Sequence, residues 1–236
     1  MSNKSNPLDK DKQTILKKQA GERAAEYVKN GMIVGLGTGS TVEWTIRKLG
    51  ELVKDGLEIL GIPTSVRSET LARKQGIKLT TLMEHPKIDL TIDGADEVDP
   101  KLNLIKGLGG ALTREKIVAA SSEKEIIVVD ESKLVEVLGT KAPVPVEVIP
   151  FAWNTCKPKL MNLNSKPVLR MVDEKEYITD NNNYILDCKF NQINNPEELE
   201  MKINNIPGVV ENGLFLKLTD IVIVASIRGV EILTFG

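Results

Sequence analysis

Short apolar runs alternate with helix-like stretches between residues 32 and 129 of the chain. The runs are rich in Ile, Val and Leu, which is typical of strands that are buried on both faces. The stretches between them carry apolar residues at helical spacing. Strands that alternate with helices in this way form a parallel sheet covered by helices on both faces. We predict strands at 32–36, 57–62, 77–82, 88–92 and 125–129, and helices at 13–29, 41–49, 68–74 and 110–121.

The pattern changes after Lys133, where strand-like runs are separated by polar loops and by proline. This mixture predicts a small α+β domain of ferredoxin-like type, inserted before two C-terminal strands that rejoin the first sheet. We therefore predict a Rossmann-like α/β fold with a main domain at 1–137 and 208–236 and a small domain at 138–207. The small domain holds no titratable residues beside a glycine turn, so we expect no catalytic group in it. The elements predicted here are an extended segment at 143–150, strands at 168–172, 177–185, 221–227 and 230–235, and a helix that begins at Asn195-Pro196.

The charge and the cysteine content narrow the class of protein. The net charge is −2, so no basic field attracts nucleic acid or a membrane surface. Cys156 and Cys188 form no CxxC pair and fit a reducing compartment better than a disulfide scaffold. Residues 1–12 are polar and lack the apolar core of a signal peptide, and no apolar run is long enough for a transmembrane helix. We expect a cytoplasmic protein that binds neither nucleic acid nor membrane.

The loop after the first predicted strand is suited to an anion. Gly35-Leu36-Gly37-Thr38-Gly39-Ser40-Thr41 joins a strand to a helix, so backbone N–H groups and the helix N-terminus can face a phosphate. Thr38, Ser40 and Thr41 can add hydroxyl donors. The run lacks the third glycine of a dinucleotide-binding fingerprint and the Gly-Lys-Ser/Thr of a Walker loop. A plain tight turn would give the same pattern and is the alternative.

Two carboxylates follow the predicted strand 88–92. In Asp93-Gly94-Ala95-Asp96 both side chains can point into one cleft, because loops after parallel strands gather at one edge of a sheet. Close like charges raise one of the two pKa values, which suits acid–base chemistry. Glu97 and Asp99 lie nearby, but the spacing is not that of an EF-hand, and the single histidine, His85, lies outside the motif. A solvated acidic loop is the alternative.

Glu115 lies on the apolar side of the predicted helix 110–121. It shares an arc with Leu112 and Val118, whereas Arg114 and Lys116 fall to either side. Desolvation on an apolar face raises the pKa of a carboxylate toward the value that a general base needs. A structural ion pair with a buried lysine or arginine is the alternative.

Lys106 precedes the run Gly107-Leu108-Gly109. The lysine can hold a phosphate or a developing oxyanion, and an ordinary surface lysine is the alternative. A phosphate loop, two carboxylates, a lysine and a half-buried glutamate would meet at one edge of the sheet. The sequence therefore predicts proton transfer on a small phosphorylated substrate.

Together these segments resemble ribose-5-phosphate isomerase, type A. Three further stretches carry the resemblance: Asp130-Glu131-Ser132-Lys133 is similar to a strand end of that family, 145–150 to its domain junction, and 207–215 to its late Pro-Gly-Val-Val-x-x-Gly-Leu-Phe segment. The resemblance spans nearly the whole chain. Leu108 stands where members of that family often have glycine, and its backbone N–H is still available.

The resemblance implies an aldose–ketose isomerisation, without cofactor or metal, between D-ribose 5-phosphate and D-ribulose 5-phosphate in a homodimer or homotetramer. It implies that Glu115 moves a proton between C2 and C1 through an enediolate, and that Asp93 assists ring opening with Asp96 beside it. Lys106 and the backbone amides of Gly107–Gly109 would stabilise the oxyanion. The substrate contacts that it implies are Thr38, Gly39, Ser40, Thr41, Asp93, Gly94, Ala95, Asp96, Lys106, Gly107, Leu108, Gly109 and Lys133.

Two other functions are compatible with the same glycine turn. A related sugar-phosphate deaminase relies on an active-site histidine, and here the single histidine, His85, lies outside every motif. A sugar-phosphate sensor domain can lose its acid–base residues, whereas Asp93, Lys106 and Glu115 are all present. Both remain alternatives to the isomerase.

Overall fold

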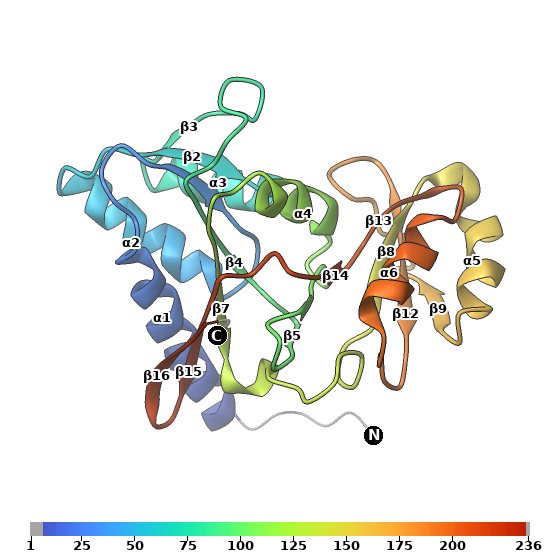
Figure 1. The fold of residues 1–236 in the computed structure, drawn as a ribbon. Coiled ribbons are helices and arrows are strands. Elements are labelled where there is room, and N and C mark those ends of the chain that lie inside the picture. The colour runs from blue at the N-terminus through green and yellow to red at the C-terminus, as the bar shows by residue number, and fades with distance from the viewer. Residues whose placement is uncertain (1–6, 235–236) are drawn as a thin grey trace.

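A computed structural model describes residues 7–234 of the chain (Figure 1). The strands of its central sheet are β1 (Ile33–Leu36), β2 (Leu60–Pro63), β3 (Lys78–Leu79), β4 (Leu90–Gly94), β7 (Glu125–Asp130), β15 (Ile221–Ser226) and β16 (Gly229–Thr234). They lie in the order β16-β15-β7-β4-β1-β2-β3. All neighbours pair in parallel except β15 and β16, which are antiparallel. The predicted mostly parallel α/β sheet is confirmed.

Helices cover both faces of this sheet. The helices are α1 (Pro7–Ala25), α2 (Val42–Lys54), α3 (Val66–Lys74) and α4 (Leu112–Ala120). The first three share an apolar cluster with one face, and that cluster includes Ala20, Ile46 and Ile126. On the other face, Leu112 of α4 belongs to a cluster with Ile127. Neighbouring residues of β7 therefore point to opposite faces, as the period of a strand requires.

The chain between β7 and β15 builds a second, antiparallel sheet, at the right of Figure 1. Its elements are β8 (Val144–Val148), α5 (Trp153–Met161), β9 (Lys166–Leu169), β12 (Tyr184–Lys189), α6 (Pro196–Asn204) and β13 (Val209–Asn212). The strands lie in the order β13-β8-β12-β9, and the two helices share an apolar cluster with them. This β-α-β-β-α-β order is that of the predicted ferredoxin-like unit. We call residues 144–212 the small-sheet region.

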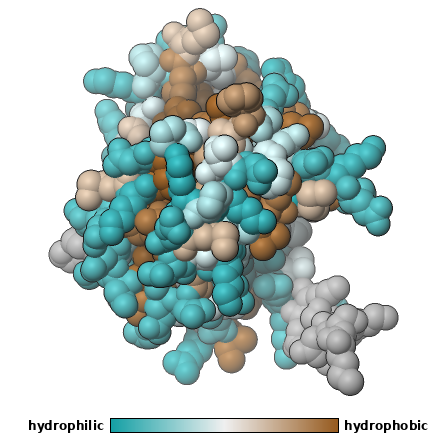
Figure 2. Space-filling view, turned by 90° about the vertical axis from the view of Figure 1, so that its right-hand side faces the viewer, coloured by the Kyte–Doolittle hydropathy of each residue, from teal (hydrophilic) through white to brown (hydrophobic). Residues whose placement is uncertain are grey.

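The small-sheet region extends past the predicted domain end at residue 207. Strand β13 pairs antiparallel with β8, so the sheet continues to Asn212 before the chain returns to the central sheet. The division of the chain into two domains stays a prediction. Figure 2 looks onto the outer face of this region, where hydrophilic side chains cover most of the surface and apolar ones show in separate places.

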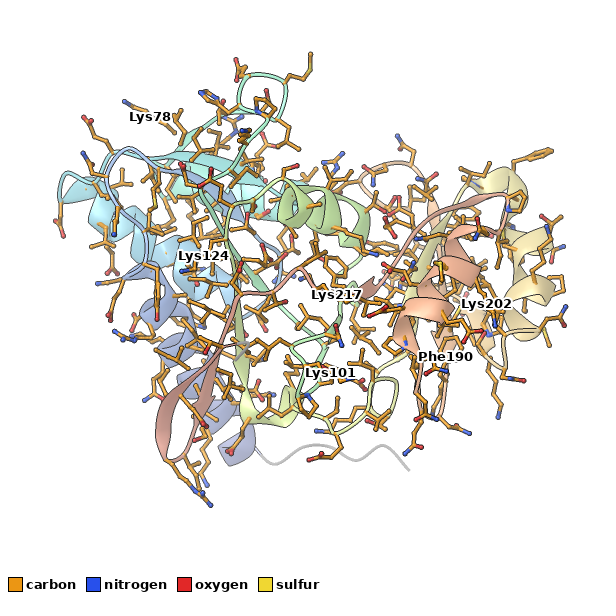
Figure 3. All side chains as sticks on the ribbon, viewed as in Figure 1. Lys78, Lys101, Lys124, Phe190, Lys202 and Lys217 are labelled. Carbon is orange, nitrogen blue, oxygen red and sulfur yellow. The ribbon has the colours of Figure 1, made fainter. Side chains whose placement is uncertain are left out.

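Three short strands form a small sheet near the junction of the two parts: β5 (Glu97–Val98), β6 (Leu104–Ile105) and β14 (Leu214–Phe215). The 3₁₀ helix η1 (Glu131–Lys133) follows β7, whereas the 3₁₀ helix η2 (Pro150–Ala152) and the pair β10 (Met171–Val172) and β11 (Lys175–Glu176) belong to the small-sheet region. Figure 3 shows side chains filling the space between the two parts. Lys217, labelled there, forms an exposed ion pair of 2.8 Å with Glu197 of α6. Such an exposed pair contributes little to stability.

The predicted strand 177–185 is wrong over most of its length. Strand β12 begins only at Tyr184, and the preceding residues form a loop closed by a hydrogen bond from the N–H of Thr179 to the carbonyl of Asn183. Asn182 has a φ of +61°, in the left-handed region that a strand does not contain. The predicted helix start at Asn195-Pro196 is confirmed: Asn195 is the N-cap residue of α6 and Pro196 its first residue, although the Asn195 side chain makes no cap hydrogen bond.

Some predictions lie at the chain ends. Residues 1–6 of the polar N-terminal segment and Phe235 of the last predicted strand lie outside the described residues. Among residues 7–234, no helix is both long enough and apolar enough to span a membrane.

Candidate active site

Charged side chains from three segments meet in a buried cluster at the carboxyl edge of the central sheet. Asp93 lies near the end of β4, Lys106 follows β6, and Glu115 lies in the first turn of α4. Lys106 Nζ is 3.1 Å from Asp93 Oδ2 and 3.7 Å from Glu115 Oε2. The exposed fraction is 0% for Asp93, 2% for Lys106 and 3% for Glu115. The structure thus brings the predicted acid–base residues into one cluster.

The glycine turn after β1 positions Asp93. Asp93 Oδ1 accepts the N–H of Thr38 at 3.0 Å and the N–H of Gly94 at 2.7 Å. Residue 37 must be glycine, because a Cβ there would lie 2.3 Å from the Asp93 side chain. Two backbone donors therefore hold Oδ1, and Oδ2 is left to contact Lys106.

Lys106 keeps its proton in this setting. Its Nζ donates a hydrogen bond to the carbonyl of Gly94 and lies 5.3 Å from the centre of the Phe215 ring. Burial works to lower the pKa of Lys106, but the charges of Asp93 and Glu115 outweigh burial and hold that pKa above its ordinary value. The cluster therefore contains a fixed positive charge.

Burial shifts the pKa of both carboxyl groups of the cluster upward. Burial raises the pKa of Glu115 to about 8; Lys106 opposes this rise, and the charges of Asp93 and Asp96 support it. Burial also raises the pKa of Asp93, again against the effect of Lys106. A carboxyl pKa near the working pH allows Glu115 both to take and to return a proton.

A cavity of about 100 Å³ opens onto the cluster, and Glu115 and Lys106 lie in its wall. The predicted substrate-binding residues that line it are Thr38, Gly39, Ser40, Thr41, Gly94, Ala95, Asp96, Lys106, Gly107, Gly109 and Lys133. Lys133 comes from η1, and the side chain of Asp130 caps this short helix by accepting the N–H of Ser132 at 3.1 Å. Residues from four separate sequence motifs therefore surround one cavity.

Thr38 and Leu108, two of the predicted substrate-binding residues, use their polar groups in hydrogen bonds to other residues of the protein. The Thr38 hydroxyl lies 2.8 Å from Thr64 Oγ1 and 2.7 Å from Ser65 Oγ, and its N–H binds Asp93. The geometry therefore favours a positioning role for Thr38. Leu108 is 43% exposed and does not line the cavity; its N–H donates to Asp96 Oδ2 at 2.9 Å.

Within residues 7–234, no three His, Cys, Asp or Glu side chains are grouped as they would be around a metal ion. His85 is not part of the cavity wall, and its Nδ1 lies 2.8 Å from the hydroxyl of Thr80. The charged groups that face the cavity are thus carboxylates and lysines.

Known proteins match this chain over most of its length. The sequence model of ribose 5-phosphate isomerase A (phosphoriboisomerase A) matches residues 60–229, more than half of the chain. The chain belongs to the ribose 5-phosphate isomerase A family. It is 53% identical to ribose-5-phosphate isomerase A of Gloeobacter violaceus over 221 residues, which are 93% of this chain and 96% of that protein.

Solved structures of the ribose 5-phosphate isomerase A family are similar as well. The structure of ribose 5-phosphate isomerase A from Methanocaldococcus jannaschii has a TM-score of 0.89 and 46% identity, with 93% of this chain and 98% of that chain covered. A structure of D-ribose-5-phosphate isomerase in complex with phospho-erythronic acid has a TM-score of 0.91 and 46% identity, with the same coverage of 93% and 98%.

In this member of the ribose 5-phosphate isomerase A family, Lys17 is a cavity residue that sequence reasoning missed. It lies on α1 and shares the cavity wall with Lys133. The spacing of the helix gives one indication of this position, because Lys17 precedes the fully buried Ala20 by three residues and so lies on the same face of α1. The neighbouring Lys18 is of the same type, so charge alone did not select the right lysine.

Glu125, at the start of β7, is a further buried carboxyl group that sequence reasoning missed. It is 2% exposed, and its Oε2 accepts no hydrogen bond from the described residues. Burial, and then the charge of Asp93, raises the pKa of Glu125 well above its ordinary value. This environment favours the neutral, protonated form.

The residues that flank Glu115 on α4 bind the small-sheet region. Glu115 itself faces the cavity, whereas its neighbours along the helix reach across to the second sheet. The small-sheet region therefore fixes the helix that carries Glu115. The bonds are Thr113 to Glu147 (2.6 Å), Arg114 to Asn181 (2.9 Å), and Lys116 to Glu211 (2.8 Å) and Glu200 (3.3 Å).

Proposed function

We propose that this chain interconverts D-ribose 5-phosphate and D-ribulose 5-phosphate. The observation that carries the proposal is the buried cluster of Asp93, Lys106 and Glu115 beside a small polar cavity, in a chain of the ribose 5-phosphate isomerase A family. An aldose–ketose isomerisation moves a proton between neighbouring carbons, so it needs a base and a positive charge for the oxyanion. This cluster supplies both.

Glu115 is the proton-transfer group of the proposed reaction. Its carboxylate takes the proton from C2 of the open-chain aldose, which leaves an enediolate, and returns a proton to C1. The hydroxyl proton on O2 passes to O1 at the same stage, which leaves the C2 carbonyl of the ketose. Lys106 Nζ, 3.7 Å from Glu115, stabilises the negative oxygen of the enediolate. Asp93 lies 3.1 Å from the same Nζ, and we assign to it the hydroxyl proton released during ring opening, with Asp96 beside it.

The phosphate group of the substrate is assigned to the other end of the cavity. Thr41, the residue before α2, makes no side-chain cap hydrogen bond, and the N–H groups of Glu43 and Trp44 donate to the carbonyls of Gly39 and Thr41. The positive end of the helix dipole at this N-terminus favours an anion. Lys17 and Lys133 lie in the same wall and add positive charge. The substrate is then held by its phosphate while the reacting carbons reach Glu115.

Compartment and assembly complete the proposal. We place the protein in the cytoplasm, and the support is that Cys156 and Cys188 are both free and buried. We expect a homodimer or homotetramer, and the support is apolar surface on β9 and β10, where Val168 is 63% and Val172 52% exposed. Light scattering on the purified chain measures its assembly.

Turnover of ribose 5-phosphate in ²H₂O, followed by NMR, tests the activity. Transfer through a carboxyl group that exchanges with solvent incorporates deuterium at C1 of ribulose 5-phosphate and at C2 of recovered ribose 5-phosphate. Substrate binding without turnover would indicate a sensor, and release of ammonia from an amino-sugar phosphate would indicate a deaminase. Either result rejects the proposed isomerase.

A further inference from the structure

Arg170 connects the small-sheet region to the glycine-rich run after Lys106. It lies between β9 and β10, and its side chain is 12% exposed. Its Nη1 donates to the carbonyl oxygens of Gly107 and Leu108, both at 3.1 Å. One guanidinium group of the second sheet therefore holds two successive peptide groups of the candidate active site.

Asp187 of β12 orients this guanidinium group. Asp187 Oδ2 accepts from Arg170 Nε at 2.9 Å, and Oδ1 accepts from Nη2 at 2.5 Å. The two-point contact fixes the plane of the guanidinium group and leaves Nη1 for the glycine-rich run. The ring of Tyr177, 5.6 Å from Arg170 Cζ, lies against the same group.

The glycine-rich run has one hydrogen bond of its own, from the N–H of Gly110 to the carbonyl of Gly107 at 3.0 Å, and this bond leaves the carbonyl of Leu108 to outside contacts. Gly107 has a φ of +102° and Gly110 a φ of +84°, in the region that glycine enters without steric cost. A Cβ at residue 110 would lie 2.1 Å from the Tyr177 hydroxyl, so the run passes directly over this tyrosine. Because glycine leaves the backbone free to turn, the direction of these peptide groups depends on partners such as Arg170.

The direction of the two carbonyl groups sets the direction of two N–H groups. A trans peptide group points its C=O and its N–H to opposite sides. With the oxygens of Gly107 and Leu108 turned to Arg170, the N–H groups of Leu108 and Gly109 point away from it. The first reaches Asp96 Oδ2 at 2.9 Å. The second donates to no other residue within 7–234, and Gly109 lines the cavity.

We propose that Arg170, oriented by Asp187, is a positioning residue that aims the N–H of Gly109 at the oxyanion of the reaction and the N–H of Leu108 at Asp96. The inference rests on the proposed function, because the oxyanion belongs to the isomerisation. Arg170 acts through two peptide groups and contacts no reacting atom. The small-sheet region then contributes to the reaction by fixing backbone donors.

A comparison of Arg170→Met with Arg73→Met tests this role. The first variant keeps the apolar stem and removes every donor. Arg73 pairs with Glu69 on the surface of α3 at 2.8 Å and is a matched control. For Arg170→Met we expect kcat to fall about 10²-fold with KM changed less than about threefold, because a displaced donor acts on the transition state. Arg73→Met should leave both within about twofold.

Two binding probes separate positioning from a general loss of structure. Phospho-erythronic acid has a planar carboxylate at the place of the two enediolate oxygens. Inorganic phosphate resembles only the phosphate group of the substrate. In Arg170→Met, the affinity for phospho-erythronic acid should fall by about the same factor as kcat, and the affinity for phosphate should stay within about twofold. Asp187→Asn, which keeps the shape and weakens the pair, should give the same pattern at about tenfold.

Several outcomes overturn the inference. One is an unchanged kcat in a folded Arg170→Met variant, and another is an equal loss of affinity for both probes. If Arg170→Met does not fold, Asp187→Asn carries the same comparison. A wild-type chain without isomerase activity rejects the proposed function instead, whereas an active wild type in which neither variant changes kcat rejects this inference alone.

Discussion

Glu115 of the cavity and Glu147 of the small-sheet region are buried to nearly the same degree, with exposed fractions of 3% and 0%. Their partners differ. Glu147 accepts hydrogen bonds from four neutral side chains, whereas Glu115 Oε2 accepts none from the described residues and faces the charge of Lys106. The donors to Glu147 are Thr113 (2.6 Å), Asn183 (2.8 Å), Thr179 (2.9 Å) and Asn181 (3.1 Å).

The difference separates a structural carboxylate from a reactive one. A buried carboxylate with four neutral donors stabilises the parts that it joins, here α4 and the 179–183 loop. A buried carboxylate with few donors is costly, and the cost is expressed as the raised pKa of Glu115. The same residue type therefore serves the framework in one region and proton transfer in the other.

Glu115→Gln should produce the largest effect. Glutamine keeps the shape of the side chain but cannot take a proton, so kcat should fall at least about 10²-fold with a modest change in KM. Initial rates with ribose 5-phosphate measure this. The pKa of Glu115 is higher in the folded protein than in the unfolded chain. The free energy of unfolding of the wild type therefore falls as pH rises from about 4.5 through about 8. Glutamine is neutral throughout, and the variant should therefore melt no lower than the wild type at pH 8. A near-normal kcat would contradict the assignment.

Lys106→Met should produce the second-largest effect, a loss of about 10²-fold in kcat. Methionine fills much of the lysine volume and removes the charge that faces the enediolate oxygen. Since that oxygen becomes negative only during the reaction, KM should change little. Steady-state kinetics separate the two parameters. A raised KM with kcat intact would reassign Lys106 to phosphate binding.

Glu147→Gln should reverse the pattern of Glu115→Gln. The amide replaces one acceptor oxygen of the four-donor network, so the free energy of unfolding should fall by about 1–3 kcal/mol. The bonds of Arg114 and Lys116 still hold α4, and kcat should stay within about threefold. Urea denaturation and initial rates on the same preparation measure both. A variant as stable as the wild type would mean that the network contributes nothing to the framework.

The smallest expected effect is a shift in the pH dependence of kcat/KM, which should differ between variants near Glu115 and variants near Glu147. Glu115 must be ionised to act as a base, so kcat/KM should rise with pH, by about tenfold per unit below its pKa, and level off above about 8. In Lys106→Met the inflection should move to higher pH, because the lysine charge lowers the pKa of Glu115. Glu147→Gln should leave the inflection in place. An inflection that does not respond to Lys106 would assign it to another group.

The sequence was sufficient where a role follows from local pattern. The alternation of strands and helices predicted the parallel sheet, and the edge rule placed Asp93, Lys106 and Glu115 together. Helical spacing alone placed Glu115 on a buried face. These predictions needed only the period of an element and the loops at its end.

Contacts between distant segments were beyond that kind of reasoning. Tyr177 and Ile178 have strand propensity, yet the turn at Asn182 keeps them out of β12. Nothing nearby in sequence shows that Asn181 and Asn183 lie across from Glu147 and donate to it. Arg170 gave no signal either, since the pairing of β9 with β12 decides that Asp187 faces it.

The anchoring of α4 on the small-sheet region has a consequence for partial unfolding. Proteins open in cooperative units whose free energies lie below that of global unfolding. Thr113, Arg114 and Lys116 all bind the small-sheet region, so an opening of that region alone would release the helix of Glu115 while the central sheet stays folded. Loss of activity in denaturant would then precede the loss of amide-exchange protection in β4 and β7.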